Sequence, residues 1–394
     1  MAATVKFHFR AKPAKARKSP GSNRVGKQHR PIGDPVEYLK SNPKFEAAPF
    51  GPPAGNLVMS LDAVAAGVSA AIAKEKQMVF HTVGDTGGVN GTETQDSVAK
   101  AMEQQIRNPG VNGSPAFFYH LGDVVYFNGI STDYPQQFFE PYQYYPALIF
   151  AIPGNHDGDT HVRNNDKPDP EPSLTGFRDN FCAAPGTHAS PYRDAMTQPY
   201  VYWTLDTPLA TIVGLYSNID GMLDAKDHGP QEAWLTQQMK DAAGDKCLIV
   251  AVHHAPYSLD VTHGGYFKIL ESLDNAIAAS KRIPDMVLSG HVHNYQRFSR
   301  QIGDRTIPYI IAGAGGYANT PKAMHKLQTE GGQQFQLPFQ TTHPDLTLQK
   351  FNQTDPGFLK VTVTPGELTA EYYIVPFEGS ANGNPYDSVT VTLG

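Results

Sequence analysis

Five short clusters of polar residues, each directly after an apolar stretch, carry the side-chain types that bind metal ions. They are Gly84-Asp85, Gly122-Asp123 with Tyr126 three residues later, Gly154-Asn155-His156-Asp157, His253-His254, and Gly290-His291-Val292-His293. Carboxylate, imidazole and amide oxygen are ligands that hard and borderline metal ions prefer. Each cluster alone has an ordinary explanation as a turn, a helix cap or a hydrogen-bonded histidine. Their joint occurrence indicates one metal site, whose chemistry would be the activation of water.

The elements that must position these clusters are short and apolar. Strands are expected at residues 77–83, 116–121, 147–152, 247–252 and 285–288, and each of them ends at a cluster. Further strands are expected at 201–205, 211–216, 308–312, 357–364 and 368–375, and helices at 60–76, 96–106, 232–243 and 266–280. In open α/β sheets, ligands bind beyond the carboxyl ends of the strands. Five strands that deliver Asp, Asn or His to that edge therefore predict a single shared site.

The order, spacing and local sequence of the five clusters resemble the calcineurin-like metallophosphoesterases and, within them, the purple acid phosphatases. The resemblance covers residues 79–315, and it is closest over 289–297. Most members of the wider superfamily carry Asp-x-His in the first cluster, but Asp85 is followed here by Thr86 and Gly87. In purple acid phosphatases a tyrosine three residues beyond the second aspartate replaces that histidine. Tyr126 occupies this position relative to Asp123, which favours the purple acid phosphatase branch.

The resemblance implies two sets of metal ligands that share one carboxylate. One metal ion would be held by Asp85, Asp123, Tyr126 and His293, and the other by Asp123, Asn155, His254 and His291. A phenolate is a charged, strong donor, so the first ion would be Fe³⁺, as in this family. An amide and two imidazoles suit a divalent second ion such as Zn²⁺, Fe²⁺ or Mn²⁺.

Two neighbouring histidines compete for one ligand position. His254 lies two residues before Pro256 and so matches the His-x-Pro of the family. His253 is then expected to face the opposite side of the strand and to be packed. His156 and His263 match histidines that contact the phosphate or protonate the leaving group in related plant enzymes, although each also has a structural interpretation.

The activity implied by the resemblance is hydrolysis of a phosphate ester by in-line attack of a metal-bound hydroxide, without a phosphoenzyme. Small phosphate monoesters are the favoured substrate class, at acidic pH. A phosphodiesterase that acts on nucleotides or other small diesters is the alternative, although diesterases of the superfamily usually retain the missing Asp-x-His. An inactive binding scaffold is the non-enzymatic alternative; such proteins normally lose several ligands, whereas all seven are present here.

The fold implied by the resemblance is an α/β four-layer sandwich of two mixed β-sheets flanked by helices. Residues 1–55 are expected to be a basic extension rich in Pro and Gly, and residues 56–394 the metallophosphoesterase catalytic domain. The stretch before residue 79 is too short and too irregular for the additional N-terminal β-domain of plant purple acid phosphatases. A single catalytic domain is therefore expected.

The charge distribution and the apolar stretches of the sequence bear on the possible partners and the cellular location of the protein. Residues 1–30 contain nine Lys and Arg and no acidic residue, although the whole chain has a net charge of −6. This basic arm would contact an anionic partner or dock on the acidic body of its own chain, and we favour the second interpretation. No stretch is long and apolar enough to span a membrane, and no secretory signal is recognisable. Cytoplasmic and exported locations both stay open, as does the oligomeric state.

Overall fold

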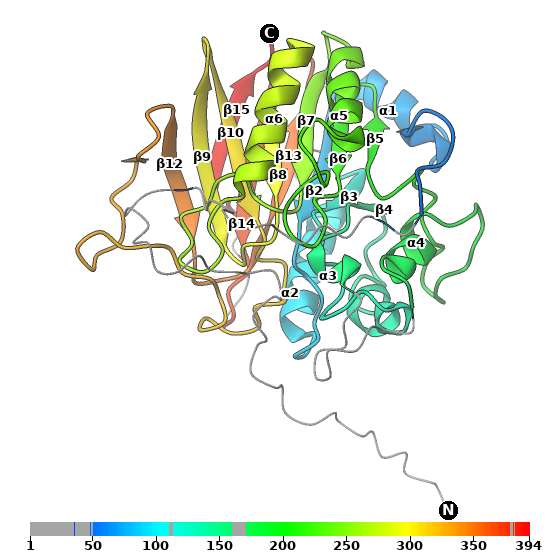
Figure 1. Cartoon of the computed structure of the whole chain (residues 1–394). Helices are drawn as coiled ribbons and strands as arrows, with labels where there is room; N and C mark the ends of the chain where they lie inside the picture. Colours follow the sequence, from blue (N-terminus) through cyan, green and yellow to red (C-terminus); the bar gives the residue numbers. More distant parts are fainter. Residues whose placement is uncertain are drawn as a thin grey trace, which may run out of the picture.

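The computed structural model describes residues 50–109, 113–159, 171–378 and 383–394, together with Pro35, Ala48 and Ala381. The expected basic arm lies outside these residues. Two mixed β-sheets pack face to face at the centre of the molecule, and helices cover their outer faces (Figure 1). Among the described residues, no helix is both long and apolar enough to cross a membrane.

The larger sheet has nine strands in the order β1-β5-β6-β7-β8-β10-β9-β12-β11. Their bounds are β1 Val58–Ser60, β5 Trp203–Asp206, β6 Ala210–Leu215, β7 Cys247–Val252, β8 Met286–Ser289, β10 Arg305–Ala312, β9 Tyr295–Ile302, β12 Leu346–Asn352 and β11 Phe339–Gln340. The neighbouring central strands β6, β7, β8 and β10 run parallel to one another. They are almost wholly buried, which explains why they appear in the sequence as continuous apolar runs.

The smaller sheet has six strands in the order β15-β14-β13-β2-β3-β4. Their bounds are β15 Asp387–Thr392, β14 Glu367–Ile374, β13 Gly357–Val363, β2 Met78–Val83, β3 Phe117–His120 and β4 Leu148–Ala151. β2, β3 and β4 run parallel, so their carboxyl ends lie at one edge of the sheet.

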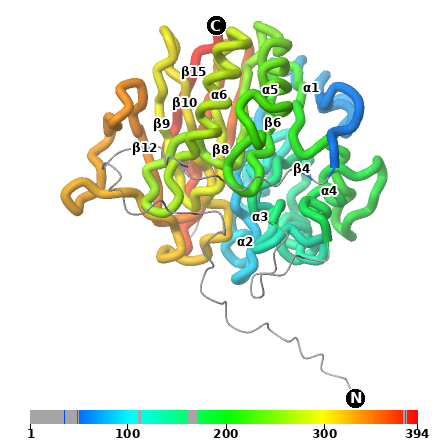
Figure 2. Tube along the Cα trace, viewed as in Figure 1, coloured from blue at the N-terminus to red at the C-terminus, as the bar shows by residue number. Residues whose placement is uncertain are grey.

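The layers follow from the alternation of side chains along the strands. On β7, Ile249 and Ala251 contribute to the core between the two sheets, whereas Val250 packs in the core beneath helices α5 Pro230–Asp241 and α6 Phe267–Ser280. These two helices lie side by side over the larger sheet (Figure 2). Helix α2 Glu93–Arg107 packs on the smaller sheet through Val98 and Met102. The predicted four-layer sandwich of two mixed sheets and flanking helices is therefore confirmed.

Two expectations about the elements were wrong or incomplete. The helix expected over residues 60–76 is interrupted: a 3-10 turn occupies Leu61–Ala63, and α1 spans only Val68–Glu75. Gly67 stands directly before α1 with a φ of 84°, a left-handed conformation that glycine adopts readily, so the helix cannot continue back through it. Strands β1, β9, β11, β12 and β15 were also not predicted. β15 is largely exposed, so it shows little of the apolar signal of a buried strand.

Candidate metal centre

Strands of both sheets end at the same place, and backbone hydrogen bonds join their ends. The amide of Asp85, after β2, donates to the carbonyl of Gly122, after β3, at 2.9 Å. The amide of Gly290, after β8, donates to the carbonyl of His253, after β7, at 3.1 Å. The amide of Gly84 donates to Ala312 at the end of β10 at 2.9 Å, which links the two sheets. These bonds join the first cluster to the second and the fourth to the fifth, and the amide of His156 joins the third cluster to Asp123.

Three side chains of the centre lie on left-handed backbone. The φ angles are 59° at Asp85, 53° at Asp123 and 67° at His291, and each of these residues follows a glycine. This conformation costs an L-residue roughly 1–2 kcal/mol, and Asp accepts it better than most residues. Residues held in such a conformation concentrate at functional sites, where the surrounding structure enforces it. The shared geometry turns all three side chains back toward the junction of the strands.

A first group of donor atoms brings together Asp85, Tyr126 and His293. The Tyr126 hydroxyl lies 3.2 Å from Asp85 Oδ1 and 3.3 Å from His293 Nε2, and the last two atoms are 3.4 Å apart. Ligand atoms at about 2.0–2.2 Å from one metal ion stand roughly 3.0–3.5 Å from each other in octahedral or tetrahedral geometry. All three side chains are buried. The trio therefore has the spacing of three ligands of a single ion.

A second group of donor atoms surrounds the amide oxygen of Asn155. Asn155 Oδ1 lies 2.9 Å from His291 Nδ1 and 3.2 Å from His253 Nε2. His253 Nε2 is also 3.4 Å from Asp123 Oδ2. Asp123, His253 and His291 each offer a ligand atom, and these atoms lie within 4.8 Å of one another. This group has the spacing of a second ion site and includes the carboxylate of Asp123.

The expectation that His253 faces away from the centre was wrong. Strand β7 ends at Val252, so the alternation of side chains along a strand no longer determines the direction of the next residue. Nδ1 of His253 lies 2.8 Å from the carbonyl oxygen of Leu121, and Nε2 points at Asn155 and Asp123. With Nδ1 held by the carbonyl of Leu121, Nε2 is the nitrogen that would bind a metal ion, which would displace its proton.

His254 contacts other residues of the centre than the carboxylate of Asp123, and it is not among the residues whose ligand atoms cluster with it. Its Nδ1 is 2.7 Å from the hydroxyl of Ser217, and its ring centre is 4.3 Å from that of His291. Burial and the neighbouring His253 hold the pKa of His254 well below the ordinary value, so its ring is neutral. The structure thus brings both histidines to the centre, but the contacts with Asn155 and Asp123 are made by His253.

The charge balance of the centre calls for cations. Asp85 and Asp123 are fully buried, and within the described part of the chain their ion-pair partners are the histidines His293 and His253. Burial lowers the pKa of His253, but Asp123 and then Asp85 more than offset this, and the pKa lies at about 9. Buried carboxylates are costly unless they are paired or coordinate a metal. The donor set and its charge therefore fit two bound metal ions.

Tyr126 occupies the space that a side chain at position 87 would need. A Cβ added to Gly87 would stand 2.9 Å from the Tyr126 ring and 2.7 Å from the amide oxygen of Gln137. Gln137 in turn accepts a hydrogen bond from the Tyr126 amide and donates one to its carbonyl, at 3.0 and 2.7 Å. The side chain of Thr86 lies against His120 at 2.8 Å. The first cluster has no histidine, and Gln137 holds the backbone of Tyr126 so that its ring lies beside Gly87.

The two further histidines predicted from the sequence lie beside the donor groups. The amide of His156 donates to Asp123 Oδ1 at 2.9 Å, and its Nδ1 lies 2.6 Å from the carbonyl oxygen of Phe127. The ring of His263 is centred 4.6 Å from the ring of His291. Both side chains are partly exposed, so they flank the centre on its solvent side.

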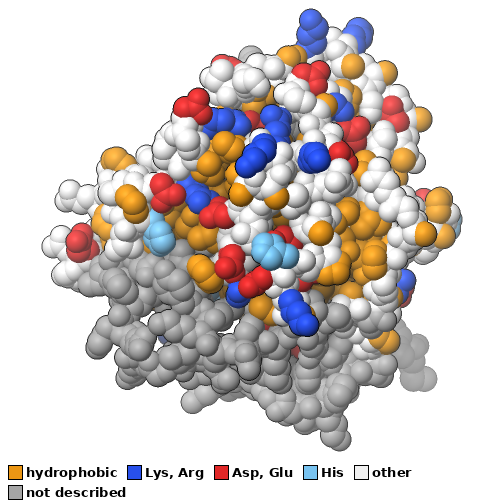
Figure 3. All heavy atoms as spheres, turned by 45° about the horizontal axis from the view of Figure 1, so that its top comes forward, with side chains coloured by type: hydrophobic (Ala, Val, Ile, Leu, Met, Phe, Trp, Pro, Cys, Tyr) orange, Lys and Arg blue, Asp and Glu red, His pale blue; other side chains and the backbone are white. Residues whose placement is uncertain are grey.

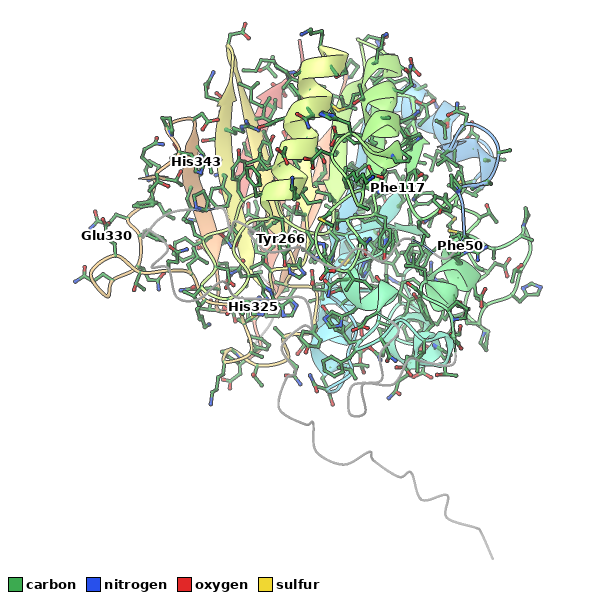
Figure 4. The ribbon with its side chains drawn as sticks, viewed as in Figure 1. Phe50, Phe117, Tyr266, His325, Glu330 and His343 are labelled. Carbon is green, nitrogen blue, oxygen red and sulfur yellow. The ribbon has the colours of Figure 1, made fainter. Side chains whose placement is uncertain are left out.

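Several residues of the centre were not predicted from the sequence. The hydroxyl of Tyr266 lies 2.7 Å from His291 Nε2, on the side of the ring opposite Asn155. Tyr317 and His325 contact Tyr126 and His293 through their rings. Figure 4 shows Tyr266 and His325 on the same side of the molecule, below α6 in that view. These three residues come from loops, and no motif or spacing in the sequence marks them.

Comparisons with known proteins agree with this arrangement. Residues 78–295, more than half of the chain, match the family model of the calcineurin-like phosphoesterases. A curated relative, Purple acid phosphatase 21 of Arabidopsis thaliana, is 25% identical over 133 residues, which are 32% of this chain and 29% of that protein. The match thus spans less than a third of the relative.

Solved structures share the fold at low sequence identity. Purple acid phosphatase PPD1 from yellow lupin (Lupinus luteus) seeds superposes with a TM-score of 0.55 at 17% identity, over 80% of this chain and 54% of that chain. GAP50, the anchor in the inner membrane complex of Plasmodium, superposes with a TM-score of 0.54 at 14% identity, over 81% of this chain and 89% of that one. The chain thus spans about half of the lupin enzyme.

Proposed function

The chain belongs to the calcineurin-like phosphoesterase family, and we propose that it is a phosphomonoesterase of the purple acid phosphatase type. The observation that carries this proposal concerns position 87, where the wider superfamily has a histidine and this chain has Gly87. The ring of Tyr126 lies beside Gly87 and leaves no room for a larger side chain. A tyrosine ligand in place of that histidine is the feature by which the sequence resembles purple acid phosphatases.

The proposed ligands follow the two donor groups. Asp85, Asp123, Tyr126 and His293 would hold the first ion, and Asp123, Asn155, His253 and His291 the second. His253 replaces His254 in this set because it is His253 that contacts Asn155 and Asp123. Burial raises the pKa of the Tyr126 phenol, so a bound cation is needed to hold it as phenolate, and Fe³⁺ suits it best. Zn²⁺, Fe²⁺ or Mn²⁺ would suit the second group.

When bound, two metal ions supply a nucleophile at moderate pH and neutralise charge on the transferred phosphoryl group. The protein's own groups position them and the substrate. Asp123 lies between the donor groups, and the amide of His156 holds one of its oxygens in place. His156 and His263 stand on the solvent side, where their rings would contact a phosphate oxygen or the leaving group.

Two other functions are compatible with the fold. A phosphodiesterase would use the same donor groups on a diester. A scaffold is the other alternative, since GAP50 shares the fold and is an anchor in the inner membrane complex of Plasmodium, and a fold does not fix a function. The complete set of buried donor atoms in this chain favours an enzyme over a scaffold.

The test compares p-nitrophenyl phosphate with bis-p-nitrophenyl phosphate across pH, after loading with iron and either zinc or manganese. We expect kcat/KM to favour the monoester by at least roughly tenfold, a difference of about 1.4 kcal/mol in the barrier, with an acidic optimum. Asn155→Ala is the control, and it should abolish the hydrolysis of both esters. A preference for the diester near neutral pH would contradict the proposal and make the chain a phosphodiesterase.

A further inference from the structure

The chain segment 313–325, which follows β10, returns across the metal centre beyond the residues that match the family model. Its backbone is tied to the first donor group at two places. The amide of Tyr317 donates to the carbonyl of Asp85 at 3.0 Å, and the amide of His325 donates to the carbonyl of His293 at 3.2 Å. The segment is therefore placed against two of the proposed ligands of the first ion.

The ring of Tyr317 contacts the aromatic ligands proposed for that ion. It stacks on the ring of Tyr126, with ring centres 3.9 Å apart and an interplanar angle of 23°. It also meets the ring of His293 at 4.7 Å with an angle of 62°. Offset-stacked and edge-to-face contacts of this kind fix the relative orientation of aromatic rings.

The ring of His325 also packs on His293. The two rings stack with centres 4.1 Å apart and an interplanar angle of 17°. The amide of His293 donates to Nδ1 of His325 at 3.0 Å, so that two hydrogen bonds join the same pair of residues. The side-chain amide of Asn294 donates to the carbonyl of His325 at 3.1 Å, which anchors the loop to the start of β9.

His293 needs such a contact because its ring lacks the usual anchor. Metal-binding histidines almost always donate their second ring N–H to a carboxylate, a carbonyl or water. Nδ1 of His293 is buried and has no hydrogen-bond partner among the described residues. By contrast, Nε2 of His291 lies 2.7 Å from the hydroxyl of Tyr266. Among the described residues, the orientation of the His293 ring therefore depends on its ring contacts with Tyr317 and His325.

We propose that Tyr317 and His325 form an aromatic clamp that positions Tyr126 and His293 and thereby sets how tightly the first metal ion is retained. The inference rests on the proposed function, because it assigns both clamped side chains as ligands. Tyr317 and His325 are positioning residues and not ligands. Groups that orient metal ligands typically change metal affinity by about 10–100-fold. The clamp lies against the Tyr126 group, so the second ion should be unaffected.

The test measures metal release from the loaded protein into a competing chelator, together with the visible absorption of an iron-bound tyrosinate. Tyr317→Leu and His325→Ala should release the first ion about 10–100-fold more readily and shift or weaken the absorption band, while the second ion is retained. Tyr317→Phe keeps the ring and should behave as the wild type. His325→Asn keeps an acceptor for the His293 amide but removes the stacked ring, so it should resemble His325→Ala. Tyr373→Leu removes a ring that stacks on Phe358, neither of which is a proposed ligand or clamp residue, and serves as the control.

The outcomes separate the clamp from the proposed function. Wild-type release rates and absorption in His325→Asn and Tyr317→Leu would overturn the clamp and leave the dimetal centre intact. Equal loss of both ions would also overturn it, because the clamp contacts the first group only. A wild-type protein that binds no metal would overturn the proposed function instead. If the wild type holds two ions but shows no visible absorption band, the number of ions released by each variant tests the clamp.

Discussion

Asp123→Asn is expected to lower kcat/KM for a phosphate monoester by roughly 10³–10⁴-fold while the fold is kept, which corresponds to several kcal/mol of lost charge stabilisation. The carboxylate of Asp123 belongs to the second donor group and is the proposed bridge to the first. Asn has the same shape and accepts the φ of 53° that this position requires. Its amide oxygen still accepts the hydrogen bond of the His156 amide, while the charge and the acceptor Oδ2 beside His253 are removed.

The measurement combines metal content, kcat/KM and thermal unfolding of Asp123→Asn. The matched control is Asp285→Asn, which changes an equally buried aspartate that pairs with Arg305 at the far end of β8. The control should unfold at a lower temperature and retain both metal ions. Asp123→Asn should retain a native fold and bind fewer than two ions. An Asp123→Asn protein with wild-type metal content and activity would refute the bridging role.

His253→Ala is expected to lose the second metal ion and to lower kcat/KM by roughly 10³-fold or more, whereas His254→Ala should keep both ions. Nε2 of His253 lies 3.2 Å from Asn155 Oδ1, and Leu121 fixes the orientation of the ring. His254 contacts Ser217 and the ring of His291, so it supports a ligand without being one. Loss of such support costs about 10–100-fold in metal affinity or activity.

The two variants are compared by the number of metal ions bound per chain at equal free metal concentration. Each variant is the control of the other, because the two positions are adjacent and the same histidine-to-alanine change is made at both. Retention of both ions by His253→Ala, with loss of one by His254→Ala, would restore the assignment by the His-x-Pro pattern. Loss of one ion in both variants would mean that both rings are required at the second site.

The sequence was most informative where a strand is buried on both faces and ends in a polar residue. The stretch 77–83 was predicted as a strand and is β2 Met78–Val83, and 247–252 is β7. Because the carboxyl ends of neighbouring parallel strands meet, the clusters that contain Asp85, Asp123 and Asn155 could be placed at one edge. The four-layer architecture, by contrast, was inferred from the resemblance to a family.

The parts that could not be predicted depend on geometry beyond the strand ends. The predicted direction of the His253 side chain was wrong because this residue follows the last residue of β7. The two-residue period of a strand no longer applies there. Tyr317 and His325 lie in a loop with no periodic pattern, and they reach Tyr126 and His293 only through the packing of the two sheets. Tyr266 is the residue just before α6, and its hydroxyl contacts His291. No sequence pattern around Tyr266 predicts this contact.

On the face of the molecule shown in Figure 3, surface charge gives no comparable signal for a partner. The face shown in Figure 3 carries Lys and Arg side chains interspersed with Asp and Glu side chains, together with apolar patches. Long-range attraction of an anion requires a field of one sign, which a mixed surface does not provide. The role of the basic arm at residues 1–30 therefore stays a prediction from the sequence.

The most direct test of the dimetal account is to measure the rate of p-nitrophenyl phosphate hydrolysis against the number of metal ions bound per chain. Metal-free protein should be inactive, and activity should rise in step with filling of the second site and level off at two ions per chain. Asn155→Ala, taken through the same titration, should bind fewer ions and stay inactive. Full activity in the metal-free protein, or a plateau at one ion per chain, would contradict the two-ion centre.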